Sequence, residues 1–222
     1  MRALLVCAAP VAGTRDLVST LASDADLIIA VDGGGAVCLD SGVVPDVVVG
    51  DFDSLLPTDL NRLRELGADI REFPAEKDSS DLELAVEAAR GLGATSIVLT
   101  AVSSGRLDHT VAALCVVCSA ADLRPHVIEP ELEYWVLSRE GRASLALSGA
   151  GTTVSLIPFG GSVVVSATGM KWELDDAVLG PLSSRGLSNQ IDPVGRALIR
   201  VTSGVVLVLV PQVNGSPRAQ VG

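Results

Sequence analysis

Two carboxylates stand two residues apart in the segment Gly50-Asp51-Phe52-Asp53-Ser54, directly after a short β-branched run. In extended chain, alternate residues point to the same side, so Asp51 and Asp53 are expected to face one spot while Phe52 packs the other way. Hard oxygen ligands at this spacing suit Mg²⁺, which takes one or two carboxylates together with water and phosphate oxygens. Their place at a strand end favours a magnesium site over the alternative of two solvated loop acids.

A second acidic segment spans residues 77–83 and opens a predicted helix. Ser80 and Glu83 match a capping box, and the helix N-terminus together with Lys77 would favour an anion such as phosphate. Asp78 and Asp81 flank the cap and are candidates for further metal ligands. Alternatively, they are first-turn acids that interact favourably with the helix dipole, and the spacing leaves both interpretations open.

Two other predicted strands also end in polar turns. The turn Asp32-Gly33-Gly34-Gly35 would let the backbone approach a ligand closely, but it is not a full G-x-G-x-x-G fingerprint and could be only a tight turn. A later strand leads to Arg106, whose guanidinium offers a fork of donors for phosphate. Beside it, Asp108 could be only a helix N-cap and His109 only a partly buried helix residue. The sequence contains no G-x-x-x-x-G-K-[ST], which excludes a P-loop.

The composition excludes several classes of protein. The 222 residues carry a net charge of −11, which argues against a nucleic-acid partner, because phosphate backbones must be met by a surplus of Lys and Arg. Apolar runs such as 111–118 and 205–210 are too short to span a bilayer, so we expect a soluble protein with no membrane partner. Cys115 and Cys118 form a C-x-x-C in an apolar helical run, where core packing is expected. The cysteine usage indicates a reducing, cytoplasmic compartment.

The polar turns must be positioned by the first half of the chain. Up to about residue 129, short β-branched runs alternate with helical patterns, which is typical of a layered α/β domain with a mostly parallel sheet. Ligands gather at the carboxyl ends of parallel strands, so the turns should meet at one edge. Strands are predicted at 3–7, 27–31, 47–49, 70–73, 96–100 and 126–128, and helices at 15–22, 35–40, 58–66, 81–92 and 109–121.

After residue 130 the helical period disappears. Gly, Ser and Pro clusters separate short runs that predict a C-terminal antiparallel β-sandwich over 134–213, following the α/β domain over 1–129. The tail 214–222 is rich in small and polar residues and is predicted to be disordered. The predicted strands of this half are 134–137, 143–147, 153–157, 163–166, 197–201 and 205–210.

Taken in order, five motifs of the first half resemble the thiamine pyrophosphokinase family. They are Val31-Asp32-Gly33-Gly34, Pro45-Asp46, Gly50-Asp51-Phe52-Asp53-Ser54, Lys77-Asp78-x-x-Asp81 and Gly105-Arg106-Leu107-Asp108-His109. In the second half, Gly169-Met170-Lys171-Trp172-x-Leu174 and Ser188-Asn189 are similar to the thiamine-binding β-domain of that family. The likeness covers nearly the whole chain. It departs from the family pattern at Ala113 and Gln190, where Asn and Glu are usual, which bears on the acceptor more than on the phosphoryl chemistry.

The resemblance implies an ATP-dependent diphosphotransferase that forms a homodimer with thiamine at the subunit interface. The thiamine hydroxyl would attack the β-phosphorus of ATP, giving thiamine diphosphate and AMP. The implied roles are a magnesium shell of Asp51, Asp53, Asp78 and Asp81; nucleotide binding by Asp32, Gly33, Gly34, Lys77, Arg106 and His109; Asp108 as a candidate base; and thiamine binding by Trp172, Ser188 and Asn189.

Alternatives stay open at this stage. Trp172 could be a core residue of the β-domain, and Ser188 and Asn189 could be ordinary turn residues. A diphosphokinase acting on a hydroxymethyl pterin would use the same aspartates with a different acceptor pocket. A non-catalytic nucleotide or thiamine sensor is a further alternative, although a sensor would need fewer acidic residues.

Overall fold

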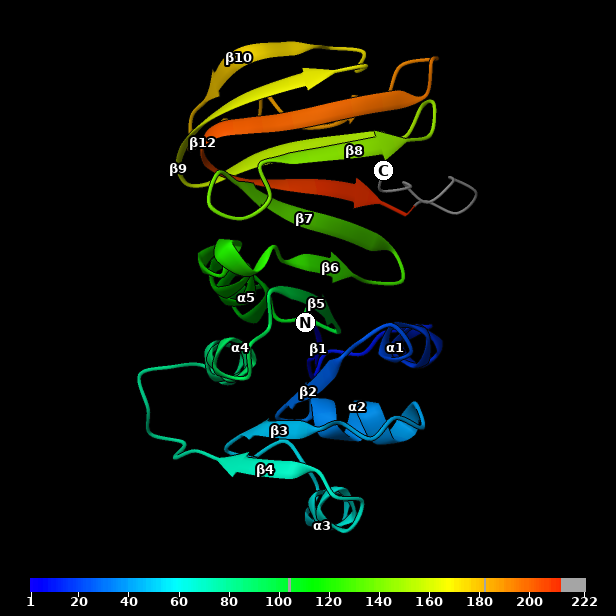
Figure 1. The fold of residues 1–222 in the computed structure, drawn as a ribbon, viewed down its shortest axis with the longest axis vertical. Helices are drawn as coiled ribbons and strands as arrows, with labels where there is room; N and C mark the ends of the chain where they lie inside the picture. The colour runs from blue at the N-terminus through cyan, green and yellow to red at the C-terminus, as the bar shows by residue number, and fades with distance from the viewer. Residues whose placement is uncertain (104, 182, 213–222) are drawn as a thin grey trace. The chain divides into compact units, whose positions relative to one another are not determined.

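The computed structural model describes residues 1–103, 105–181 and 183–212, which fall into two compact units (Figure 1). The first unit comprises Met1–Val116 and Val127–Pro130. The second comprises Val117–His126 and the chain from Glu131 onward. The first unit is α/β and the second is built almost entirely of antiparallel strands, so the predicted fold class is confirmed. The predicted disordered tail, 214–222, lies outside the described residues.

The first unit holds a parallel sheet in the strand order β5-β1-β2-β3-β4. Its inner strands are apolar and almost completely buried, as expected for a parallel sheet covered on both faces. The strands are β1 (Arg2–Val6), β2 (Leu27–Val31), β3 (Val47–Gly50), β4 (Asp69–Glu72) and β5 (Ser96–Thr100), and a short strand β6 (His126–Ile128) follows later in the chain.

Helices alternate with these strands, as the periodicity predicts. They are α1 (Thr14–Ala22), α2 (Gly34–Asp40), α3 (Pro57–Glu65), α4 (Asp81–Gly91) and α5 (Leu107–Ser119). In α4, Ser80 and Glu83 form the predicted capping box, and an apolar stripe at helical spacing is buried. Helices that begin just after the strands place their N-termini at the carboxyl edge of the sheet, where the polar turns also lie.

The second unit is a two-layered antiparallel arrangement built around two long strands. The first part of β9 pairs with the last part of β12, and β7 and β11 flank this pair. The last part of β9 pairs with the first part of β12, and β8 and β10 flank that pair. Buried side chains from both sets of strands form one core cluster, as in a sandwich. The elements are η1 (Ala121–Leu123), β7 (Leu132–Ser138), β8 (Ser144–Ser148), β9 (Thr153–Thr168), β10 (Leu174–Leu179), β11 (Asn189–Gln190) and β12 (Arg196–Pro211).

The long strands differ from the sequence prediction, which divides each of them into two short strands. The glycines that indicated turns are bends instead: Gly160 and Gly204 have φ values of 74° and 81°, and the β12 register shifts between Val201 and Val205. A glycine in a strand commonly marks such a bend. The sequence also missed β10, because its two acidic residues hide the apolar alternation.

Among the described residues, no helix combines the length and the apolar character required to cross a bilayer.

Candidate functional site

Three aspartates gather at the carboxyl ends of β2 and β3. One carboxylate oxygen from each of Asp32, Asp51 and Asp53 lies within 4.8 Å of the others. The two strands are parallel neighbours with Val31 opposite Val49, so both end at the same level. The Asp32 N–H continues the pairing by donating to the Val49 carbonyl oxygen at 2.8 Å. Strand register therefore places Asp32 beside the two aspartates that follow β3.

The backbone at both strand ends turns sharply. Asp32 and Phe52 have left-handed φ values of 48° and 61°, which are unfavourable for residues with a side chain and often mark functional sites. The expectation of extended chain through Asp53 is therefore wrong, since β3 ends at Gly50. The carboxylates come together because the chain turns: the Asp51 Oδ1 atom accepts from the Asp53 N–H at 3.2 Å. Phe52 packs against the core, as predicted.

Two glycines permit the close packing behind these aspartates. A Cβ at Gly34 would lie 1.9 Å from the Val6 carbonyl oxygen, so the start of α2 rests directly on the end of β1. A Cβ at Gly50 would lie 3.0 Å from the Asp32 Cα atom. Glycine is therefore required at position 34 for the contact between the start of α2 and the end of β1, and not for the approach of a ligand.

The acidic cluster is joined to a second acidic segment by one lysine. Lys77 Nζ lies 3.3 Å from Asp51 Oδ2 and 3.0 Å from Asp81 Oδ1, and all three side chains are at most a quarter exposed. Desolvation lowers the pKa of Lys77, but hydrogen bonds and charge from Asp81 and Asp51 outweigh it and raise that pKa overall. Desolvation raises the pKa of Asp81 against the opposing influence of Lys77, and the charges of Asp51 and Asp32 raise it further.

One oxygen in this cluster has no protein partner. The Ser54 hydroxyl donates to Asp32 Oδ2, while Asp32 Oδ1 is buried without a hydrogen-bond partner among the described residues. A buried carboxylate oxygen without a donor is unfavourable unless a cation or ligand satisfies it. With Asp81, the cluster holds four carboxylates against the single positive charge of Lys77, which leaves an excess of negative charge. The donor set thus fits a hard divalent cation.

The structure separates the sequence-predicted ligands into two groups. It brings Asp51, Asp53, Asp81 and Lys77 together and adds Asp32, which the sequence assigned to the nucleotide pocket rather than to the metal. Asp78 is exposed and is not part of the three-aspartate group. The signal that could have placed Asp32 with the metal candidates is its position directly after β2, which matches the position of Asp51 directly after β3.

Arg106, Asp108 and His109 lie exposed at the start of α5. Arg106 Nη2 donates to Asp108 Oδ2 at 2.7 Å, and Arg106 Nε donates to Asp108 Oδ1 at 3.3 Å. The hydrogen bond from Arg106 lowers the pKa of Asp108. Asp108 lies inside the helix, which begins at Leu107, so the N-cap alternative is wrong. Its carboxylate is instead paired with the guanidinium predicted to bind phosphate.

In the second unit, Trp172 is 56% exposed with Lys171 Nζ 4.6 Å from its ring centre, so the core alternative is wrong for this residue. The buried Asn189 side chain donates to the Trp172 carbonyl oxygen at 2.7 Å and accepts from the Trp172 N–H at 3.2 Å. Asn189 therefore holds the backbone of Trp172 in place. Ser188 is exposed, has a left-handed φ of 58°, and donates its N–H to the Ser155 hydroxyl oxygen at 3.0 Å.

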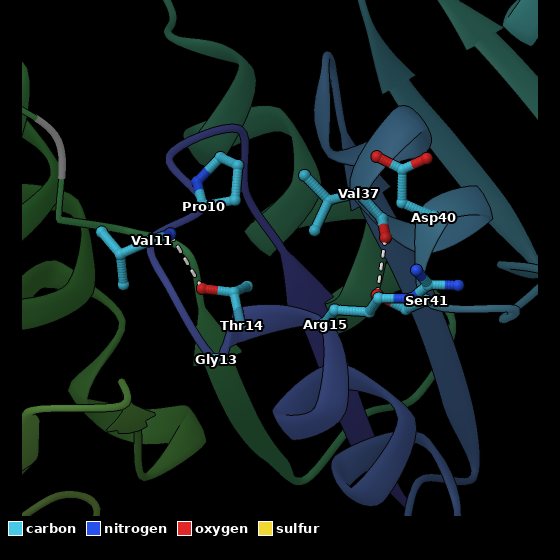
Figure 2. Close-up of a pocket in the computed structure, with 8 residues that line it drawn as sticks. All are labelled: Pro10, Val11, Gly13, Thr14, Arg15, Val37, Asp40 and Ser41. Atoms are coloured by element: carbon cyan, nitrogen blue, oxygen red, sulfur yellow. Dashed lines mark hydrogen bonds between the residues drawn. The ribbon is translucent and has the colours of Figure 1, made fainter.

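A separate hollow of about 330 Å³ lies between the loop after β1 and helix α2 (Figure 2). The Thr14 hydroxyl oxygen accepts from the Val11 N–H and the Ser41 hydroxyl donates to the Val37 carbonyl oxygen, so local bonds engage its buried hydroxyls. The sequence-predicted site residues do not line it. Its lining residues are Pro10, Val11, Gly13, Thr14, Arg15, Val37, Asp40 and Ser41.

Two family models match the chain. The model described as thiamin pyrophosphokinase, catalytic domain, matches residues 18–128, and the model described as thiamin pyrophosphokinase, vitamin B1 binding domain, matches residues 140–206. The first match alone spans half of the chain, and the two matches follow each other in the order of the two halves.

Individual relatives agree with the family models. The chain is 26% identical over 193 residues to a thiamine pyrophosphokinase of Bacillus subtilis, covering 81% of this chain and 86% of that protein. It is 25% identical over 173 residues to thiamine pyrophosphokinase 1 of Oryza sativa, covering 74% and 64% respectively.

Solved structures show the same fold. A crystal structure of thiamine pyrophosphokinase from Bacillus subtilis superimposes with a TM-score of 0.79 at 21% identity, covering 96% of this chain and 100% of that one. A thiamin pyrophosphokinase family protein from Enterococcus faecalis superimposes with a TM-score of 0.77 at 18% identity, with the same coverage.

Proposed function

Because the chain belongs to the thiamin pyrophosphokinase family, we propose that it transfers the diphosphoryl group of ATP to the hydroxyl of thiamine, giving thiamine diphosphate and AMP. The observation that carries this proposal is the acidic cluster at the strand ends, bridged to the start of α4 by Lys77. Transfer of a diphosphoryl group requires positioning and charge neutralisation more than covalent participation by the protein. The clustered carboxylates and the largely buried ammonium group of Lys77 fit that requirement.

We propose that Asp32, Asp51 and Asp53 hold Mg²⁺, with Asp81 close by and Asp78 reaching the metal through water or substrate. The unpartnered Asp32 Oδ1 atom and the surplus of negative charge support this assignment. When bound, Mg²⁺ would neutralise phosphate oxygens and orient the leaving group. Neighbouring side chains orient the carboxylates: the Ser54 hydroxyl orients Asp32, and Lys77 orients Asp51 and Asp81.

The cations of the first unit are proposed to bind the ATP phosphates. Lys77 is a compact point charge, and Arg106 presents a planar fork suited to two phosphate oxygens. Arg106 would exchange its exposed pairing with Asp108 for a phosphate, which would free Asp108 to act as a base on the acceptor hydroxyl. The Gly33 and Gly34 turn and His109 complete the nucleotide site in the domain proposed for residues 1–129.

The acceptor is proposed to bind to the β-domain over residues 134–213. The exposed Trp172 ring would cover the cationic thiazolium, which an aromatic face attracts. Lys171 lies over that ring and would have to move away. Asn189 fixes Trp172 through the Trp172 backbone, and Ser188 is the neighbour of Asn189 in the chain.

We further propose a homodimer with thiamine at the subunit interface. We also propose a reducing, cytoplasmic location, which agrees with the four free cysteines.

Product analysis tests the proposal directly. Purified protein incubated with Mg²⁺, ATP and thiamine is expected to form thiamine diphosphate and AMP in equal amounts, separated by ion-pair chromatography. Formation of ADP and thiamine monophosphate would contradict diphosphoryl transfer. Turnover only with a hydroxymethyl pterin would identify that alternative acceptor, and binding of ATP and thiamine without any product would identify a sensor.

A further inference from the structure

The turn that follows β5 contains an anion-binding arrangement of backbone N–H groups. Ala101 has a left-handed φ of 56°, and three successive N–H groups, those of residues 101, 102 and 103, point to one place. Such a concave run of N–H groups is the kind of feature that binds phosphate in other proteins. It lies at the carboxyl end of a parallel strand, where phosphate would be expected.

In this protein the chain itself fills that arrangement. Glu129 Oε1 accepts from the Val102 N–H at 2.7 Å and from the Ser103 N–H at 3.1 Å, and Glu129 Oε2 accepts from the Ala101 N–H at 3.1 Å. The Glu129 side chain lies on the segment that follows β6, and the residue is only 6% exposed. While Glu129 accepts from these donors they are not open to a substrate phosphate, and the proposed phosphate contacts are left to Lys77 and Arg106.

A carboxylate buried this deeply is costly, so its three bonds require an explanation. Desolvation raises the pKa of Glu129, and the hydrogen bonds from Ser103, Val102 and Ala101 offset only part of that effect. An apolar residue would avoid the desolvation but would leave three buried N–H groups without an acceptor. The carboxylate thus fixes one conformation of the turn at residues 101–103.

We propose that Glu129 is a positioning residue for phosphoryl transfer, holding the turn at residues 101–103 so that Arg106 is presented to the nucleotide phosphates. This inference rests on the proposed function and adds a residue that does not touch substrate. A second link supports the role of the turn: the Ala9 N–H donates to the Ala101 carbonyl oxygen at 3.0 Å, which ties the turn to the loop after β1. The turn is thereby anchored from both sides, with the carboxylate as its central acceptor.

The test compares Glu129→Gln and Glu129→Ala with a matched control, Glu133→Gln. Glu133 is also a buried glutamate, but its partner is His126 Nε2 at 2.7 Å. Gln at position 129 keeps one oxygen acceptor and turns an NH₂ group toward an N–H group, so kcat/KM for ATP should fall about tenfold, with a fall of about 10²-fold for Ala. The KM for thiamine should stay within twofold of the wild-type value, as should both parameters in the control.

A double-mutant cycle with Arg106→Ala shows whether Glu129 acts through the arginine. If it does, Glu129→Gln should change kcat/KM less than twofold in the Arg106→Ala background, because the interaction is already lost. Full additivity of the two changes, or wild-type kcat/KM for ATP in Glu129→Gln, would overturn the inference. Calorimetric binding of Mg·ATP without thiamine gives the same comparison if the wild type forms no thiamine diphosphate. The absence of thiamine diphosphate would count against the proposed function, whereas unchanged Mg·ATP binding in Glu129→Gln would count against the role of Glu129.

Discussion

At the scale of single residues, the site combines an excess of carboxylates with one central lysine. Lys77 bridges Asp51 and Asp81, while Asp32 keeps one buried oxygen without a protein donor. Without a bound cation, the clustered carboxylates repel one another and destabilise the fold. The charge imbalance supports the proposal that a cation and a polyphosphate bind at this site.

Replacing Asp51 or Asp53 by Asn tests this charge balance. Each variant should lose about 10²- to 10³-fold in turnover and need more Mg²⁺ for half-maximal rate, because an amide oxygen is a weaker ligand than a carboxylate. Thermal unfolding and circular dichroism should stay close to the wild type. Asp24→Asn, an exposed aspartate beyond α1, is the control. Turnover within twofold of the wild type in both variants would refute the metal assignment.

Two buried cysteines predict how stability depends on alkaline pH. Burial raises the pKa of Cys7 and of Cys38 to about 12, from an ordinary value of 9.0. Between these values the folded chain binds more protons than the unfolded chain, so the free energy of unfolding should fall as pH rises above about 9. Urea unfolding from pH 8 to pH 11 should show this fall, and Cys38→Ala should make it shallower. An equal slope in the variant would contradict the assignment.

At the scale of elements, the site depends on how closely α2 approaches β1. Gly34 is the first residue of α2 and lies against the Val6 carbonyl oxygen. Together with the turn at Asp32, this contact aims the glycine-rich segment toward the strand ends. The same edge receives the capped start of α4, which carries Asp81.

A pair of glycine variants tests this packing. Gly34→Ala should lower the free energy of unfolding by about 3 kcal/mol, because the added methyl group meets backbone 1.9 Å away. Gly91→Ala, at the last residue of α4 with open space around it, should raise it by about 0.5 kcal/mol through helix propensity. Urea unfolding at pH 7 measures both. Equal midpoints for the two variants would show that α2 can shift away from β1 at little cost.

At the scale of the whole molecule, the proposed dimer with thiamine between subunits makes a separate prediction. If each site takes Asp51 from one subunit and Trp172 from the other, mixing inactive Asp51→Asn and Trp172→Ala proteins should restore activity. Random exchange makes half of the dimers mixed, with one intact site in each, so about a quarter of wild-type activity is expected. Unmixed proteins at the same concentration are the control. No recovery after confirmed subunit exchange would place both residues in one chain.

Local patterns were sufficient for much of the first unit. The strands at 27–31 and 96–100 and the stripe of α4 follow from side-chain periodicity, and the capping box of Ser80 and Glu83 follows from neighbours three residues apart. These features depend on interactions within one turn or one strand, so the order of residues along the chain contains them. The Asp51 and Asp53 pair was found in the same way, although the chain joins them by a turn and not by extended strand.

Only the tertiary structure decided which distant residues meet. Asp32 joins the pair because β2 and β3 are parallel neighbours in a particular register, and Glu129 reaches residues 101–103 across more than 25 positions. Likewise β9 and β12 continue through their glycines because pairing partners are present on both sides of each bend. Sequence alone determined the chemical groups and the elements that hold them. Their assembly depended on strand order, register and packing, which are contacts between residues far apart in the chain.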